Sequence, residues 1–123
     1  MKAVQISKTG GPEVLELKEI TLNKPAANEV MIEHKAIGLN YIDTYHRSGL
    51  YPLKLPTNIG AEGAGIIREK GSDVKDFNVG DKVSYSGIPL GAYSSHRNYP
   101  TKNLVKVPDN IDLEIAATLM TKG

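Results

Sequence analysis

The chain lacks cysteine and tryptophan entirely and has a single phenylalanine in 123 residues. Without cysteine it can form no disulfide, no thiolate nucleophile and no cysteine-ligated zinc or iron–sulfur centre. Most interpretations as a small secreted scaffold are excluded with them. Six tyrosines supply nearly all of the aromatic surface, so the places where they gather are informative.

Neither sign of charge dominates: 15 basic residues face 14 acidic ones, for a formal net charge of +1. No lysine or arginine cluster is longer than a pair. This balance gives no electrostatic argument for a nucleic-acid or membrane partner. No apolar run approaches membrane-spanning length, and the N-terminus lacks the apolar core of a signal peptide. We therefore expect a soluble, cytoplasmic protein.

Short segments of alternating polar and apolar residues, separated by turn residues, occupy most of the chain. They lie at residues 4–6, 14–21, 30–36, 59–70, 82–85, 92–99 and 104–107. About seven short strands with turns at close intervals are typical of a barrel or a sandwich rather than of βαβ units. The chain is long enough for one domain with its own core.

Two helices are expected. The first covers Tyr41–Ser48, and the second begins after Asp112, a favourable N-cap, and runs to about Met120. Ile111 and Ala116 stand at the positions of a hydrophobic staple. The second helix is mostly apolar, with nothing after it to cover it. We expect self-association or a homodimer through this helix and open strand edges.

The run from Gly38 to Pro52, GLNYIDTYHRSGLYP, holds more hydrogen-bonding groups than a connection needs. Capping explains several of them. Asn40 stands at the N-cap of the first helix, Asp43 at N3 can complete a capping box, and Gly49 closes the helix. Asp43 and Arg47 are spaced for an i,i+4 ion pair.

Helix capping does not account for the tyrosines of this run. Tyr41 and Tyr45 share a helix face, and Tyr51 follows just beyond the cap. Phenols offer flat apolar surfaces and neutral donors near neutral pH. Loops and loop-borne helices are where sites are usually built. From the residues alone, a capped helix and half of an active site are equally favoured, and the two are compatible.

Other candidate sites are weaker. The glycines of Gly60–Gly71 follow G-x-x-G-x-G, the reverse of the dinucleotide fingerprint, and favour a strand with close backbone approach. Glu62 within it is expected to be half-buried. His34 continues an apolar strand face and is expected to be half-buried with its hydrogen bonds satisfied, whereas His46 and His96 are expected to be solvated. No metal-ligand spacing or catalytic triad is present.

Six segments together resemble a known family. They are GGPEVLEL at 10–17, AIGLNYIDTYHRSGLYP at 36–52, GAEGAGIIREKGSDV at 60–74, VGDKV at 79–83, GAYSSH at 91–96 and ATLMTKG at 117–123. The chain resembles the N-terminal, GroES-like catalytic domain of the medium-chain dehydrogenase/reductase superfamily. More narrowly, it resembles the zinc-free quinone oxidoreductases related to zeta-crystallin.

The resemblance implies a mainly β (α+β) fold: a GroES-like, partly open β-barrel with two short helices. It assigns residues 1–123 to one domain that is incomplete at its C-terminus. Zinc-dependent relatives carry a histidine where this chain has Ala61 and a zinc-binding cysteine where it has Asn40. With those ligands missing, the resemblance implies no metal.

The implied activity is hydride or electron transfer from NADPH to a quinone. The family's cofactor-binding stretch maps onto Asn40, Tyr41, Ile42, Asp43, Thr44 and Tyr45. Tyr45 and Tyr51 are the implied catalytic residues, lining the pocket where nicotinamide and quinone stack.

Members of the family continue into a Rossmann domain that binds the pyrophosphate of the cofactor, and this domain is absent here. We therefore expect the chain alone to be inactive and to bind NADPH without useful affinity. Two alternatives stay open: a non-catalytic remnant or interaction module with the same fold, and a zinc-free enoyl reductase. A co-chaperonin role would rest on shared topology alone.

Overall fold

The computed structural model describes residues 1–50 and 52–122, with side chains up to residue 117 of the last helix. The strands are β1 (Lys2–Ile6), β2 (Glu16–Glu19), β3 (Glu29–Gly38), β4 (Thr57–Asn58), β5 (Glu62–Lys70), β6 (Lys82–Ser86), β7 (His96–Pro100) and β8 (Val105–Lys106). The helices are α1 (Tyr41–Ser48) and α2 (Leu113–Lys122), with short 3-10 turns at Pro12–Val14 and Thr101–Asn103.

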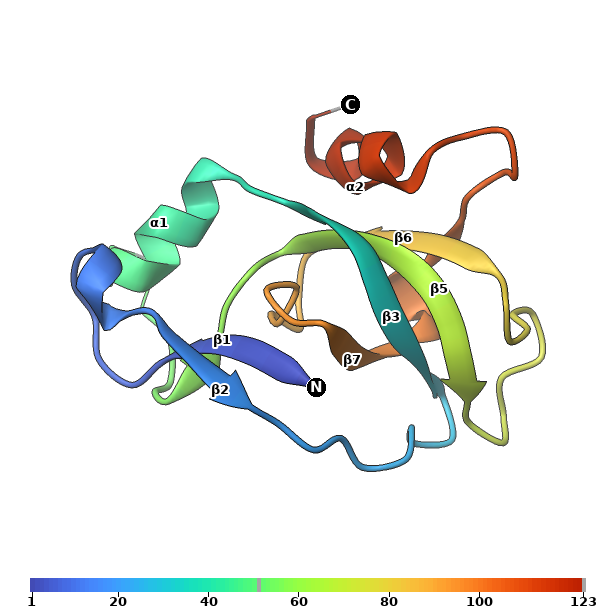
Figure 1. Ribbon diagram of the computed structural model, residues 1–123, viewed down its shortest axis with the longest axis horizontal. Coiled ribbons are helices and arrows are strands. Elements are labelled where there is room, and N and C mark those ends of the chain that lie inside the picture. Colours follow the sequence, from blue (N-terminus) through green and yellow to red (C-terminus); the bar gives the residue numbers. More distant parts are fainter. Residues whose placement is uncertain (51, 123) are drawn as a thin grey trace.

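The strands form two antiparallel sheets (Figure 1), ordered β2-β1-β4 and β7-β3-β5-β6-β8. A bridge between Ala3 and Ser94 joins them. Within the described residues the sheets do not close into a complete barrel. The predicted mainly β, partly open architecture with two short helices is therefore confirmed.

Most of the core lies against the inner face of the larger sheet. Its buried members come from β3, β5, β6 and β7 and the connections between them: Val30, Ile32, Ile67, Val74, Phe77, Val83, Tyr85, Ala92, Tyr99 and Leu104. Tyr85 and Tyr99 stack at its centre, with ring centroids 4.1 Å apart. In this chain, which has no tryptophan, two tyrosines supply the bulk of the aromatic core.

The glycines of β5 permit close contact with β3. A Cβ atom on Gly65 would lie 2.1 Å from the carbonyl oxygen of Glu33, and one on Gly63 would lie 3.0 Å from the ring of His34. The interpretation of this segment as a strand with close backbone approach is confirmed. It forms no phosphate-binding turn before a helix.

The strand expected at residues 14–21 is shorter than predicted. Val14 is buried in a 3-10 turn, and β2 contains only Glu16–Glu19, with exposed side chains on both faces. β2 is an edge strand whose one neighbour is β1. Leu15 lies just before β2 and Leu17 within it, and both side chains are exposed, so the strand has no buried face.

α2 begins directly after Asp112, as predicted, and its first turn is closed by the Ala116 amide donating to the Asp112 carbonyl. Ala116 and Ala117 are buried against β3, β5 and β6, and Ile111 packs on the same cluster. Figure 1 shows α2 lying across one end of the larger sheet, beside the end of β3 that leads to α1.

Candidate functional site

β3 ends at the point where the chain turns outward into α1. Asn40 is the N-cap, with extended φ and ψ of −131° and 155°. At the other end Gly49 adopts the left-handed conformation, with φ of 88°, and its amide donates to the Tyr45 carbonyl. A side chain at position 49 would be strained by this φ, so glycine ends the helix here as predicted.

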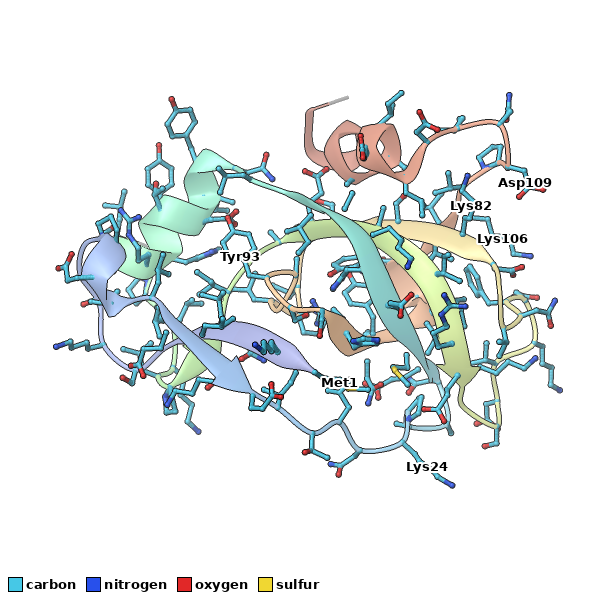
Figure 2. The ribbon with its side chains drawn as sticks, viewed as in Figure 1. Met1, Lys24, Lys82, Tyr93, Lys106 and Asp109 are labelled. Atoms are coloured by element: carbon cyan, nitrogen blue, oxygen red, sulfur yellow. The ribbon has the colours of Figure 1, made fainter. Side chains whose placement is uncertain are left out.

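Asp43 holds the start of α1 in place. Its carboxylate is 3% exposed, and Oδ2 accepts a hydrogen bond from the Asn40 amide at 3.1 Å. The same oxygen accepts from the Tyr93 hydroxyl at 2.5 Å. Tyr93 lies beneath α1 in the loop before β7 (Figure 2). One carboxylate thus fixes the helix both to its own N-terminus and to a segment 50 residues away.

The Tyr93 phenol keeps its proton in this arrangement. Burial raises the pKa of Tyr93 above its ordinary value, and the hydrogen bond to Asp43 and that carboxylate's negative charge raise it further. The phenol is therefore a permanent donor to Asp43 at physiological pH. Charge-assisted hydrogen bonds of this kind are short and about twice as strong as neutral ones.

A second buried carboxylate supports the N-cap itself. Glu62 is fully buried at the start of β5, and its Oε1 accepts a hydrogen bond from the side-chain Nδ2 of Asn40 at 3.0 Å. Gly38 makes room for it, because a Cβ there would lie 2.4 Å from Glu62 Oε1 and 2.8 Å from the Ala117 carbonyl. β3, β5 and α2 therefore meet at this corner. Glu62 is more deeply buried than the half-buried position predicted for it.

The segment from Leu39 to Tyr45, which Asp43 and Glu62 hold from the buried side, exposes apolar side chains on its outer side. Tyr41 is 83% exposed and Leu39 73%, while Tyr45 and Ile42 are exposed by about a third. A shallow cavity of 290 Å³ is lined by Leu39, Asn40, Tyr41 and Thr44. Large apolar side chains grouped on a rigid support are typical of a surface that binds a ligand or partner.

The structure places the predicted cofactor stretch, Asn40 through Tyr45, as the N-cap and first turns of α1. Within it, Asp43 faces inward and Tyr41 outward. Tyr51, the other predicted catalytic residue, lies outside the described residues. The predicted Asp43–Arg47 ion pair is wrong, since no such pair occurs among the described residues. Arg47 instead donates from Nε to the Gly10 carbonyl at 3.3 Å.

Two histidine predictions also need correction. His46 is 9% exposed, on the buried face of α1, and is not solvated. His96 is half-buried, with Nδ1 3.0 Å from Ser95 Oγ and Nε2 3.3 Å from Glu33 Oε2. Their arginine neighbours in the sequence favour solvation, but a helix turns every third or fourth residue inward and a strand every second one.

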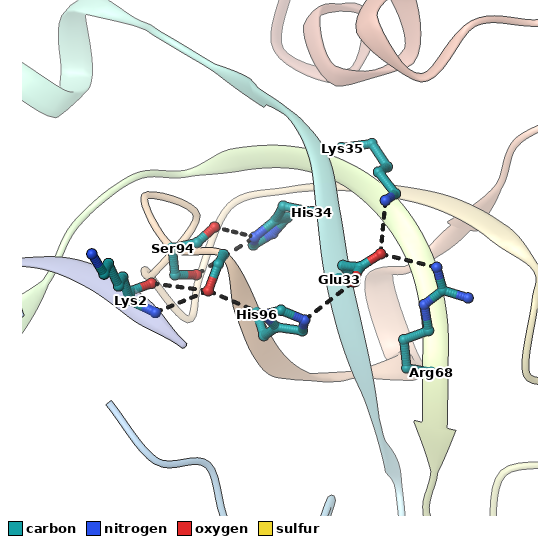
Figure 3. A network of polar contacts seen from close by, with 8 residues as sticks. Lys2, Glu33, His34, Lys35, Arg68, Ser94 and His96 are labelled. Atoms are coloured by element: carbon teal, nitrogen blue, oxygen red, sulfur yellow. Dashed lines mark hydrogen bonds and ion pairs between the residues drawn. The ribbon is translucent and has the colours of Figure 1, made fainter. Parts of the chain in front are cut away.

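Figure 3 shows the carboxylate of Glu33 among the side chains of Lys35, Arg68 and His96. Lys35 lies 2.8 Å from it and Arg68 2.9 Å, with His96 on the other oxygen. Hydrogen bonds from Lys35 and then Arg68 lower the pKa of the Glu33 carboxyl to about 2. The group is on the surface, and its arrangement is that of a solvated ion-pair network.

His34 is half-buried with both ring nitrogens satisfied, as predicted. Nδ1 donates to the Ser94 carbonyl at 2.8 Å, so Nε2 accepts from the Tyr85 hydroxyl at 2.7 Å. Burial lowers the pKa of His34 to about 4, and the nearby Arg97 charge acts in the same direction. The imidazole is neutral and belongs to the core.

The structure also shows two groups whose roles the sequence did not reveal. Tyr93 lies in GAYSSH, a segment that marks the family without indicating which residue it contacts. Glu62 was conspicuous as an acid among small residues, but its bond to Asn40 was not foreseen. No signal in a single sequence pairs residues 22 or 50 positions apart.

Within the described residues, no group of three His, Asp or Glu side chains is placed to hold a metal ion. No helix in this part of the chain has the length and hydrophobicity needed to cross a membrane.

The sequence profile of the alcohol dehydrogenase GroES-like domain matches residues 26–109, which is well over half of the chain. The chain belongs to this family. A quinone oxidoreductase from Pseudomonas aeruginosa is 50% identical to it over 123 residues, covering 99% of this chain and 38% of the relative. The GroES-like domain described here thus spans little more than a third of the curated relatives it matches.

Two further similarities bear on chemistry. The structure of Escherichia coli quinone oxidoreductase in complex with NADPH superimposes with a TM-score of 0.92 at 47% identity, over 95% of this chain and 36% of that one. A 2-haloacrylate reductase from Burkholderia is 42% identical over 127 residues, covering 98% of this chain and 38% of the relative. GroES-like domains this similar therefore occur in reductases of more than one substrate class.

Proposed function

We propose that this GroES-like domain is the substrate-facing part of an NADPH-dependent quinone reductase that works without zinc. The observation that carries the proposal is the exposed segment from Leu39 to Tyr45. It presents tyrosine side chains outward while Asp43 holds its backbone from below. A site needs side chains held within fractions of an ångström, and a helix start anchored at two buried carboxylates gives that rigidity.

The residues fit the nicotinamide end of the cofactor. Asn40, Tyr41 and Thr44 line the 290 Å³ cavity. Ile42 and Tyr45 are partly exposed on the same helix, and Asp43 acts through the backbone that it holds. When bound, NADPH supplies a hydride to an acceptor that is already electrophilic. The tight hold on this stretch means that little order has to be gained when a ligand binds.

Tyr45 and Tyr51 are the proposed catalytic residues. A tyrosine ring packs against a planar quinone, and its hydroxyl can donate a hydrogen bond to a quinone oxygen as negative charge develops there. Asn40 and Ala61 stand where zinc-dependent relatives carry ligands, and neither is a side chain that zinc prefers. Hydrogen-bond donors therefore replace a metal as the groups that polarise the substrate.

A chimera tests this function directly. Residues 1–123 of this chain would replace the matching N-terminal part of the Pseudomonas aeruginosa quinone oxidoreductase. We expect NADPH oxidation that depends on added 1,4-benzoquinone, with the unaltered relative as the positive control. A folded chimera that binds NADPH but reduces no quinone would contradict the proposal.

The same chimera separates the alternatives. The Burkholderia relative favours a second candidate, reduction of an activated carbon–carbon double bond, as in an enoyl reductase. Faster turnover of 2-chloroacrylate or an enoyl thioester than of any quinone would assign that function. No turnover of either class, with NADPH binding intact, would favour the non-catalytic interaction module.

The 123-residue chain by itself is a separate test. We expect calorimetric titration of these 123 residues with NADPH to show no binding in the micromolar range, because they contain no glycine-rich turn leading into a helix of the kind that binds a pyrophosphate. Micromolar binding would contradict this. We also expect light scattering to detect self-association through open strand edges. A clean monomer would count against that expectation.

A further inference from the structure

Glu62 is a fully buried carboxylate directly behind the candidate site. Its backbone is fixed from two sides, because β5 pairs at this residue with Gly38 of β3 and with Ser86 of β6. Taking a carboxylate out of water costs free energy unless hydrogen bonds compensate for it. An acid at this depth, held rigidly beside the site, is therefore a candidate for a role in it.

The contact between Glu62 and the site is the side chain of Asn40. Glu62 Oε1 accepts a hydrogen bond from Asn40 Nδ2 at 3.0 Å. Asn40 itself is half-buried and belongs to the lining of the 290 Å³ cavity. Asn40 thus lies between a buried carboxylate on one side and the open cavity on the other.

Helix capping does not require this contact. An N-cap side chain needs an oxygen that accepts from the first helical amides, and aspartate supplies one as well as asparagine does. An aspartate at position 40 would bring a second carboxylate against Glu62, whereas asparagine presents a donor to it. The buried acid therefore accounts for an amide at this N-cap.

The Asn40 side-chain nitrogen carries two hydrogens, and Glu62 accepts only one of them. The two N–H bonds diverge within the plane of the carboxamide, so fixing the first on the buried side turns the second away from that side. We propose that Glu62 is a positioning residue that directs the second N–H of Asn40 into the cavity, where it donates to a quinone oxygen. This role rests on the quinone reduction proposed above.

The direction of this N–H should affect turnover more than binding. A quinone that accepts a hydride from NADPH gathers negative charge on an oxygen, and solvent supplies the proton that completes the hydroquinone as NADP⁺ forms. A donor aimed in advance at that oxygen interacts more strongly with the developing charge than with the neutral quinone. Losing its orientation should therefore lower kcat and leave KM nearly unchanged.

The chimera with the Pseudomonas relative provides the kinetic test. Glu62→Met keeps the length of the side chain and removes both acceptor oxygens, so we expect kcat for 1,4-benzoquinone to fall about tenfold, with KM within about twofold. Glu62→Gln retains one acceptor oxygen and should recover most of the parent's kcat. Glu69→Met makes the same change at an exposed position of β5 and is the matched control, with parent-like kinetics.

A double-mutant cycle separates positioning from support of the fold. Asn40→Ser keeps an N-cap oxygen and removes the carboxamide nitrogen, so it should lower kcat by itself. Glu62→Met should then add little in the Asn40→Ser background, because Glu62 acts through Asn40. Additive losses would overturn the proposal, and so would a parent-like kcat in the folded Glu62→Met chimera.

NMR of the 123-residue chain tests the contact without any activity. The Asn40 Nδ2 hydrogen that faces Glu62 should resonate downfield in the parent and in Glu62→Gln. In Glu62→Met it should move upfield, toward the position of a solvated amide. A parent-like Asn40 signal in a folded Glu62→Met variant would overturn the role of Glu62, whereas a parent chimera that binds NADPH but reduces no quinone would contradict the proposed function.

Discussion

Two polar pairs, one in the middle of β3 and one beyond its end, serve different purposes. At His34 of β3, a neutral imidazole accepts a hydrogen bond from Tyr85 of β6, which is a member of the apolar core. Beyond the end of β3, the Asp43 carboxylate accepts from Tyr93 under a helix whose tyrosines are exposed. The first pair stabilises the sheet. The second sets the direction of a surface segment, which is what a binding site requires.

Removing the Tyr85 ring, one half of the His34–Tyr85 pair, should have the largest effect on stability. Tyr85 is fully buried and stacked on Tyr99. Tyr85→Ala should therefore lower the free energy of unfolding by about 3–5 kcal/mol, as large-to-small core changes do. Tyr41→Ala, at an 83% exposed position, is the matched control and should stay within about 0.5 kcal/mol. Urea denaturation measures the free energy of unfolding of both variants. Similar losses in Tyr85→Ala and Tyr41→Ala would contradict the difference expected between a buried and an exposed tyrosine.

The His34–Tyr85 pair should also make the free energy of unfolding depend on pH. Because the folded pKa of His34 is about 4, against an ordinary value of 6.5, the unfolded chain binds the proton more readily. The stabilisation is complete above pH 6.5 and is lost as the pH falls toward 4, on the order of 2–3 kcal/mol. His34→Gln should flatten the urea-derived stability profile in this window. A variant profile as steep as the parent's would contradict the assignment to His34.

The hydrogen bond between Tyr93 and Asp43 should stabilise the structure more locally, around α1. Tyr93→Phe leaves Asp43 without its charge-assisted donor, so we expect a loss of about 1.5 kcal/mol. Amide hydrogen exchange should accelerate across α1 more than across β3. Tyr41→Phe, which removes an exposed phenol from the same helix, provides the control and should leave exchange unchanged. Equal acceleration in β3 would mean that Tyr93 supports the whole fold rather than the site.

The sequence predicted local features well, because they depend on near neighbours. The β5 glycines, the Asn40 N-cap with Asp43 at N3, and the Gly49 terminus are all found as expected. Each follows from backbone geometry or from hydrogen bonds that span three or four residues. The same holds for Asp112 at the start of α2.

What the sequence missed depends on contacts between distant segments. The i,i+4 spacing predicts an ion pair between Asp43 and Arg47. Instead, the buried Asp43 carboxylate accepts a hydrogen bond from Tyr93, and Arg47 donates one to the Gly10 carbonyl. His46 precedes Arg47, which favours a solvated histidine, but it lies on the buried face of α1. The depth of Glu62 follows from the meeting of β3, β5 and α2, which alternation in one strand cannot reveal.

Tyr45 provides the most direct test of the proposal that the exposed face of α1 belongs to a quinone site. In the chimera with the Pseudomonas relative, Tyr45→Ala should raise the quinone KM roughly three- to tenfold through lost aromatic packing. Val79→Ala, an exposed apolar position in a distant turn, should leave kinetics unchanged. The measurement is steady-state kinetics at saturating NADPH. A raised quinone KM in Tyr45→Ala alone would support a quinone site at α1, and parent-like kinetics in this variant would contradict it.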